Sequence, residues 1–318
     1  MTNGLNGSRV LVTGAAGMVG SAIVRTLLAL GTDVRAHAGP PGTEPAALPR
    51  DLPVSFAEIT DAQAVGRIVA EVDAVVHLAG PASVAESFSS PAVYARAHVV
   101  GTAAVIEACR AADVRRLIHI SSAEVYGQPR ANPVAEDAPT EPRSPYGAAK
   151  LGAEAMVGSS CPAAGIAAYV LRPFSVYGPR SPERSLVGRL ARAAVGEEPV
   201  RLAALRPVRD YVHVDDVAAA VAAALADLDP ADPAAAVPVF NLGSGVGTSV
   251  HELATLTLEL AGRSAEIEET PAPDRPAGQD ITHLVADIDR TRSQLGWAPA
   301  VPLRAGLAEV VEAVRRDR

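Results

Sequence analysis

The chain has 318 residues, a net charge of −8 and an isoelectric point near 5.4. This acidic balance and an aromatic content of only 3% exclude the basic, ring-bearing face of a nucleic-acid binder. Hydrophobic residues make up 48% of the chain, which is enough for a large buried core and excludes wholesale disorder.

Targeting and metal-binding signals are missing from the sequence. Residues 1–8 do not have the organisation of a secretory signal, and no uncharged apolar run approaches the roughly 20 residues of a membrane span. The two cysteines, Cys109 and Cys161, have no metal-ligand spacing and make no disulfide framework. We therefore expect a soluble cytoplasmic protein with no metal site and no membrane or nucleic-acid partner.

The first half of the chain alternates short apolar runs with longer helical patterns. Strands are expected at 9–13, 33–38, 54–56, 74–79, 116–120 and 167–171, and helices at 21–30, 93–111 and 147–158. Apolar strands separated by helices favour a parallel sheet that is covered on both faces. The predicted fold class is therefore α/β, with a Rossmann-type doubly wound parallel sheet.

The pattern changes beyond residue 172. Helices are expected at 185–195, 215–227, 250–262 and 303–316, and a glycine-rich loop at 240–247. We assign residues 1–172, with a returning segment at about 208–243, to a dinucleotide-binding domain. Residues 173–207 and 244–318 are assigned to a smaller, interleaved substrate-binding lobe.

Three glycines, Gly14, Gly17 and Gly20, lie between the first strand and the first helix, with Met18 and Val19 among them. Glycine at such positions allows a tight turn and a close backbone approach, and the helix that follows directs its free N–H groups at an anion. The strand, glycines and helix together predict the pyrophosphate site of a dinucleotide.

The end of the second strand bears on the choice of dinucleotide. An acid there would bond the adenosine ribose hydroxyls, but the expected position is Ala38. This leaves NADP open beside NAD, with Arg35 and Arg50 as candidate ligands of a 2′-phosphate. Glu58, which precedes Ile59, stands where an acid could accept a hydrogen bond from the adenine amino group, or it is an ordinary solvated acid.

A serine, a tyrosine and the single lysine form the candidate catalytic group. Ser122 follows the strand at 116–120, and Tyr146 and Lys150 are one helical turn apart. An adjacent ammonium favours a phenolate, so we expect Lys150 to lower the pKa of Tyr146 towards the working range. Of the 28 basic residues, all but this one are arginines. Arginine cannot replace a compact ammonium beside a phenol, which favours a functional role for Lys150.

With these residues the sequence resembles the extended short-chain dehydrogenase/reductase family, the nucleotide-sugar epimerases and dehydratases. The resemblance runs end to end, through the glycine loop, the tyrosine and lysine, and the runs 77–80, 101–102, 121–127, 171–179, 209–217, 240–245 and 295–297. It implies a likeness to UDP-glucose 4-epimerase, with Ser122, Tyr146 and Lys150 as the catalytic residues.

The resemblance also implies the binding residues. Besides the glycine loop, Tyr146 and Lys150, the implied cofactor ligands are Glu58, Ile59, Leu78, Ala79, Gly80, His98 and Pro173. The implied substrate ligands are Ser83, Ala123, Glu124, Ser175, Arg209 and Arg275. His98 and Ser175 stand where the family has asparagines, and Ala82 where some epimerases have lysine. His213 is expected to pack in the 209–217 run.

The implied activity is epimerisation at C4 of a UDP- or dTDP-linked hexose through a 4-keto intermediate, with NAD. The alternative is an NADPH-dependent 4-keto-sugar reductase, which Ala38 favours. Dehydration would need a carboxylic acid at Ala123, so it is disfavoured, although Glu124 keeps a decarboxylase-like chemistry open. A third hypothesis is a cofactor-sensing Rossmann protein without catalysis. The resemblance further implies a homodimer formed through the helices at about 93–111 and 147–160.

Overall fold

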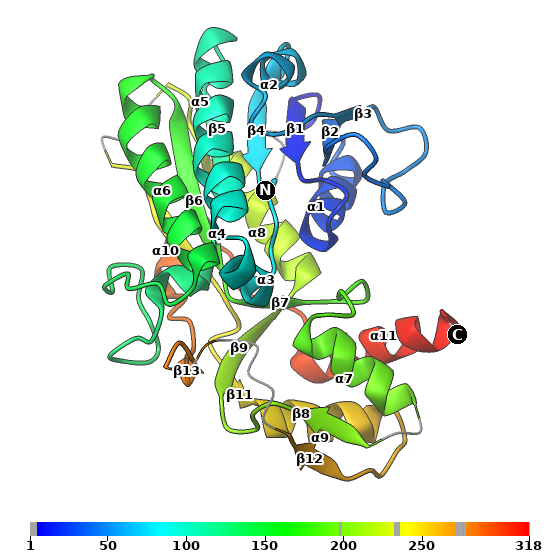
Figure 1. Cartoon of the computed structure of the whole chain (residues 1–318). Helices are drawn as coiled ribbons and strands as arrows, with labels where there is room; N and C mark the ends of the chain where they lie inside the picture. Colours follow the sequence, from blue (N-terminus) through cyan, green and yellow to red (C-terminus); the bar gives the residue numbers. More distant parts are fainter. Residues whose placement is uncertain (1–4, 197–198, 232–235, 271–275, 277, 318) are drawn as a thin grey trace.

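The computed structural model describes residues 5–196, 199–231, 236–270, 276 and 278–317. Its largest sheet has seven strands, all parallel, in the order β10-β6-β5-β4-β1-β2-β3 (Figure 1). The strands are β1 Arg9–Thr13, β2 Asp33–Gly39, β3 Val54–Phe56, β4 Ala74–His77, β5 Arg116–Ile120, β6 Ala167–Pro173 and β10 Val239–Leu242. The predicted α/β fold class is confirmed.

Helices cover both faces of this sheet because its strands are apolar on both sides. Val10 and Val12 of β1 pack into the core under α1 and α8, whereas Leu11 packs into the core under α2, α5 and α6. The helices on these faces are α1 Met18–Ala29, α2 Ala62–Val69, α4 Pro91–Ala95, α5 Gly101–Ala111, α6 Pro145–Ala163 and α8 Val214–Asp227. Two further short helices are α3 Val84–Ser89 and α10 Asp289–Leu295.

The helix expected at 93–111 is interrupted. A π-helical turn, η1 (Arg96–Val100), lies between α4 and α5. Such turns widen a helix and redirect its side chains, and they are frequent at functional sites. Among the described residues, no helix is long and apolar enough to span a membrane.

The glycine-rich loop expected at 240–247 is shorter than predicted. Residues 239–242 form β10, which pairs with β6 at the edge of the large sheet. Phe240 and Leu242 are fully buried there. The glycines that follow obscured this strand, because a run of four residues carries little periodicity of its own.

The C-terminal part of the chain builds a smaller lobe (Figure 1). Its four-stranded sheet contains β7 Ser175–Tyr177, β9 Val208–His213, β11 Gly247–Ser249 and β13 His283–Leu284, and β8 Val200–Leu202 pairs with β12 Ile267–Glu269. Three helices share a core with these strands, α7 Leu186–Val195, α9 Val250–Leu260 and α11 Leu303–Arg316. Between these segments the chain returns to the large sheet with α8 and β10, so the two lobes are interleaved.

Candidate active site

The glycine loop lies at the carboxyl end of β1. Gly14 has φ +70°, and a Cβ there would lie 3.0 Å from the Cα of Ala79. A Cβ on Gly20 would lie 2.2 Å from the carbonyl oxygen of Gly14, so neither position tolerates a side chain. Gly17 is the N-cap of α1 and offers no side-chain cap, which leaves the first N–H groups of the helix available to an anion. This glycine-lined cradle fits the pyrophosphate of a dinucleotide.

A chain of hydrogen bonds joins this loop to η1. The hydroxyl of Thr13 accepts bonds from the N–H groups of Leu78 and Ala79 at 3.1 and 3.2 Å. It lies 2.8 Å from Nδ1 of His77, whose Nε2 lies 3.1 Å from the hydroxyl of Thr102 in α5, and that hydroxyl donates to the carbonyl of His98 in η1. The ends of β1 and β4 are thereby held to the helix that carries His98.

The other residues expected to bind the cofactor lie along the same edge of the sheet. Ile59 packs on Gly101, where a Cβ would lie 2.9 Å from Cγ2 of Ile59. His98 packs on Gly80, and its Nε2 donates to the carbonyl of Pro81 at 2.9 Å. Pro173 is the last residue of β6, and Glu58 is exposed beyond β3. Val19 lies in the first turn of α1. Its neighbour Met18 contacts Ser181, with the sulfur 3.8 Å from the serine hydroxyl.

The structure also shows the position at which an acid would bond the adenosine ribose hydroxyls. Ala38 is buried near the carboxyl end of β2. Arg35, a candidate 2′-phosphate ligand, instead lies 3.8 Å from Asp33 at the opposite end of the strand. Its guanidinium therefore points away from the edge where the cofactor would lie. Arg50 is exposed in the segment that precedes β3.

Ser122, Tyr146 and Lys150 converge where β5 ends. Ser122 caps the 3-10 turn η2 (Ala123–Tyr126) by accepting a bond from Glu124 N at 3.2 Å, and it also hydrogen-bonds the phenol of Tyr146. Nζ of Lys150 donates to the carbonyl of Ile120 at 2.8 Å. Tyr146 and Lys150 are both buried, so their chemistry is shielded from bulk water.

Local sequence signals place this part of α6. Ser144 is its N-cap and accepts a bond from Gly147 N at 3.0 Å, and Pro145 occupies the first helical position. The ring of His98 meets the ring of Tyr146 edge-on, with centroids 5.6 Å apart. Burial lowers the pKa of His98 to about 2, so this histidine is neutral at working pH.

The pKa of the Tyr146 phenol differs from the one expected beside Lys150. Burial raises the pKa of Tyr146 to about 12, and the hydrogen bond from Ser122 opposes this increase only in part. Glu124 and Tyr94 raise the pKa of the phenol further. The pKa of Tyr146 is raised and not lowered towards neutrality as predicted, because the sequence carries no measure of desolvation.

Four of the six predicted substrate residues are brought together across the two lobes. Ser83, Glu124, Ser175 and Arg209 line one pocket of about 380 Å³. Ser83 also caps α3 and accepts a bond from the hydroxyl of Tyr94 at 2.6 Å through its carbonyl. Ala123 is buried in η2 and does not line this pocket, and Arg275 lies outside the described residues.

Several residues at the site were missed in the sequence. Arg184, Arg189 and Tyr211 line the same pocket, and Arg184 pairs with Glu86 of α3 at 3.8 Å. The two arginines lie in or next to a stretch rich in proline and arginine. No sequence pattern there indicates where their side chains point. Thr13, directly before Gly14, could have been suspected from that position alone. His213 is buried, and its Nδ1 accepts a bond from Asp215 N at 3.3 Å at the start of α8.

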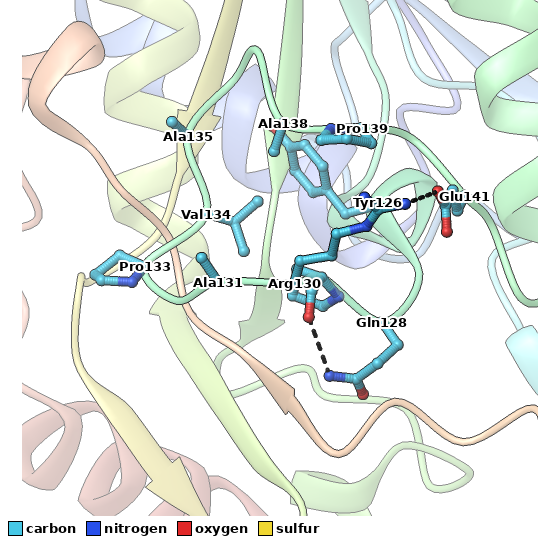
Figure 2. Close-up of a pocket in the computed structure, with 11 residues that line it drawn as sticks. Tyr126, Gln128, Arg130, Ala131, Pro133, Val134, Ala135, Ala138, Pro139 and Glu141 are labelled. Carbon is cyan, nitrogen blue, oxygen red and sulfur yellow. Dashed lines mark hydrogen bonds and ion pairs between the residues drawn. The ribbon is translucent and has the colours of Figure 1, made fainter.

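A second pocket, of about 210 Å³, lies within the loop that connects η2 to α6 (Figure 2). Its walls are mostly alanine, proline and valine side chains, with the ring of Tyr126 on one side. Arg130 crosses it towards Glu141, 3.5 Å away. It shares no lining residue with the substrate pocket, and we assign it to the packing of this loop.

Comparison with known proteins places the chain in a family. Residues 10–243 match the model of the NAD dependent epimerase/dehydratase family. A UDP-glucose 4-epimerase of Mycolicibacterium smegmatis is 35% identical over 96% of this chain and 98% of its own length. The chain therefore belongs to the NAD-dependent epimerase/dehydratase family of enzymes, as the resemblance predicted.

Solved structures agree with this assignment. The UDP-glucose 4-epimerase of Thermus thermophilus, in complex with NAD, superposes with a TM-score of 0.85 at 31% identity and covers 96% of this chain and 99% of its own. MoeE5, in complex with UDP-glucuronic acid and NAD, superposes with a TM-score of 0.84 at 31% identity, covering 98% of this chain and all of its own. This enzyme is similar to both over its whole length.

Proposed function

We propose that this protein is an NAD-dependent 4-epimerase of a nucleotide-linked hexose, acting through a 4-keto intermediate. The observation that carries the proposal is the position of Ser122, Tyr146 and Lys150. Ser122 follows β5, which lies two strands from the β1 end that carries the glycine cradle, and it is two residues from Glu124 of the pocket that also contains Arg209. A sugar held in that pocket would reach both the hydroxyl–phenol pair and the cofactor edge of the sheet.

The residues divide the proton chemistry among them. Tyr146 exchanges the proton of the C4 hydroxyl, and Ser122 bonds the same oxygen and the phenol. The buried Lys150 ammonium supplies positive charge near the phenol, where burial disfavours the phenolate. The chemistry that NAD supplies when bound is reversible acceptance of hydride from C4. Glycine-loop residues would hold its pyrophosphate, and Lys150 would bond its nicotinamide ribose.

Epimerisation also requires the 4-keto sugar to rotate within the pocket. Small side chains contribute to the walls of the pocket, namely Ala82, Ser83 and Ser175. Arg209, which lines the same pocket, is suited to hold a diphosphate because a guanidinium bonds phosphate oxygens in pairs. An anchored diphosphate and small walls support rotation of the sugar about a fixed end.

The placement of Arg35 removes one of the two candidate ligands of a 2′-phosphate and so favours NAD over NADP. Arg35 pairs with Asp33 at the far end of β2 and cannot clamp a 2′-phosphate from there. The buried Ala38 offers neither an acid nor a cation. Two structural neighbours bind NAD, and one binds UDP-glucuronic acid, which favours a UDP-linked sugar as substrate.

Conversion of UDP-glucose and UDP-galactose by purified protein, followed by proton NMR without added reductant, tests this function. We expect interconversion in the wild type and a loss on the order of 10²-fold or more in Tyr146→Phe, with an unchanged circular dichroism spectrum. Turnover of only a 4-keto sugar, and only with added NADPH, would establish the reductase instead. Full activity of Tyr146→Phe would contradict the assigned base.

We also propose that the enzyme is a homodimer. The helices α5 and α6 lie side by side at one edge of the molecule (Figure 1). Val93 of α4 and Val100 of η1 are 57% and 50% exposed, unusual for valines on a helix that faces water. Ala148 and Ala155 on the exposed side of α6 permit close approach of another helix. Pairing these helices with those of a second copy would bury the exposed valines.

A further inference from the structure

Three charged or polar side chains of α6 follow one another at intervals of four residues and face the end of β5. After Tyr146 and Lys150 comes Glu154, one further helical turn along the same face. Lys150 donates to the carbonyl of Ile120, and the hydroxyl of Ser121 donates to the Glu154 carboxylate. The two residues immediately before Ser122 are therefore both tied to α6.

The carboxylate of Glu154 is fixed from its other side by Arg172 of β6. The guanidinium donates from Nε to Oε1 at 2.9 Å and from Nη2 to Oε2 at 2.6 Å. Both side chains are buried. Arg172 also donates to the hydroxyl of Tyr126 at 2.9 Å and to the carbonyl of Glu136 at 3.1 Å. Each charge is thus satisfied, and the carboxylate cannot rotate without breaking several bonds.

The environment of Lys150 gives this carboxylate an electrostatic effect. Burial lowers the pKa of Lys150 from 10.5 to about 8, and the charge of Glu154 opposes that decrease. The histidines that interact electrostatically with Lys150 have lowered pKa values, chiefly through burial, so they are neutral: His77 of β4, His98 of η1 and His119 of β5. Tyr94 and Glu124 act on Tyr146 and are not among the causes that shift the pKa of Lys150, and Arg172 is paired with Glu154.

We infer that Glu154 is a positioning residue of the catalytic group. Its carboxylate keeps the buried Lys150 ammonium charged at neutral pH, and its bond from Ser121 holds the backbone that carries Ser122. The bidentate ion pair with Arg172 orients the carboxylate. The inference rests on the proposed role of Lys150 in the epimerase reaction.

The single lysine of the chain allows a direct test. Protein of the native sequence, labelled with carbon-13 at the lysine ε position, gives one lysine resonance, and its shift against pH reports the charge of Lys150 alone. We expect a midpoint near pH 8 in the wild type. In Glu154→Gln the midpoint should fall by about one pH unit, because the charge that opposes the effect of burial on Lys150 is removed and the Arg172 cation is left unpaired.

Two further variants separate charge from structure. Ser121→Ala removes a hydrogen bond to Glu154 but leaves its charge, so the midpoint should stay within about 0.3 pH unit of the wild type. Glu154→Asp also keeps the charge and should largely restore the midpoint. Glu154→Gln leaves the buried Arg172 without a carboxylate, and this single variant could fail to fold for that reason. In that case the double variant Glu154→Gln, Arg172→Gln replaces the ion pair with two amides. The double variant should still show a decrease, but a smaller one than Glu154→Gln, because the positive charge of Arg172 is removed as well.

An unchanged midpoint in folded Glu154→Gln, or in the double variant, would overturn the inference. The alkaline limb of kcat/KM should move to lower pH by the same amount, because activity is lost as Lys150 loses its proton. The titration needs no turnover, so its failure leaves the proposed epimerase intact. Conversely, full activity of Tyr146→Phe would defeat the proposed function without changing the titration.

Discussion

Lys150 lies in a buried position that strongly disfavours a charged group. It is 4% exposed, and the histidines around it are neutral. An ammonium there has given up its hydration for a bond to the Ile120 carbonyl and the attraction of Glu154. The other basic residues of the chain are arginines, whose planar, always protonated groups suit ion pairs such as Arg172–Glu154 but cannot titrate.

This burial makes the stability of the fold depend on pH in a defined direction. The pKa of Lys150 is about 8 in the folded chain and 10.5 ordinarily, so between these values the unfolded chain binds the proton and the folded chain does not. Relative to Lys150→Met, the wild type should therefore gain about 2–3 kcal/mol of unfolding free energy from pH 8 to 10, at about 1.4 kcal/mol per pH unit. Below pH 8 the difference should be constant.

Urea denaturation of both proteins at pH 7, 8, 9 and 10 measures this effect, and groups common to both cancel. Parallel stability curves over the whole range would contradict the depressed pKa of Lys150. The proposed reaction uses the charged amine, so activity should fall over the pH range in which stability rises.

At the scale of elements, two helix starts build the site. The start of α1 presents backbone N–H groups at the glycine cradle, and the start of α6 sets the angle of Tyr146 through the cap at Ser144. Between them, η1 places His98 against the ring of Tyr146. Gly20 is the tightest of the glycines in the cradle, because a Cβ on it would overlap the carbonyl of Gly14.

Gly20→Ala should therefore displace the loop from the first turn of α1. We expect a loss of NAD affinity of about tenfold or more and a fall in melting temperature, since the neighbour in the way is backbone and cannot rotate aside. Isothermal titration with NAD and thermal unfolding measure the two effects.

Gly66→Ala is the matched control for this substitution. Gly66 also lies within a helix, α2, but a Cβ there meets nothing within 4 Å. It should stabilise the protein by about 0.5–1 kcal/mol and leave NAD affinity unchanged. If the two variants had the same NAD affinity and the same melting temperature, the glycine cradle would have room for a Cβ at Gly20, contrary to the structure.

At the scale of the whole molecule, the substrate pocket depends on both lobes. Ser83 and Glu124 come from the large α/β lobe, and Arg209 comes from the small sheet. Buried Asp210 holds the small sheet together by accepting bonds from Ser244 N at 2.6 Å and Ala286 N at 3.1 Å. The pocket exists because the chain passes between the lobes more than once.

The proposed dimer would form on the side of the molecule opposite α8. Ala155→Arg places a charge on the exposed side of α6 and should give monomers by light scattering, with the far-ultraviolet dichroism retained. Ala219→Arg, an equally exposed alanine on α8, should leave the dimer intact. Monomeric wild-type protein, or dimers of Ala155→Arg, would refute the proposed interface.

The sequence by itself determined the features that depend on neighbours in the chain. The glycine spacing, the apolar strands, the caps and the Tyr146–Lys150 interval are local, because helix and strand geometry set which nearby residues share a face. The seven-stranded sheet differs from the predicted pattern mainly at β10, whose four residues precede glycines.

Only the tertiary structure decided the surroundings of those residues. The Glu154–Arg172 pair, the packing of His98 on Gly80 and the arginines of the substrate pocket join segments that are far apart in the chain or arranged without periodicity. The pKa of Tyr146 was mispredicted for the same reason. Desolvation depends on every atom that surrounds a group, whereas spacing along the chain reports only the nearest ones.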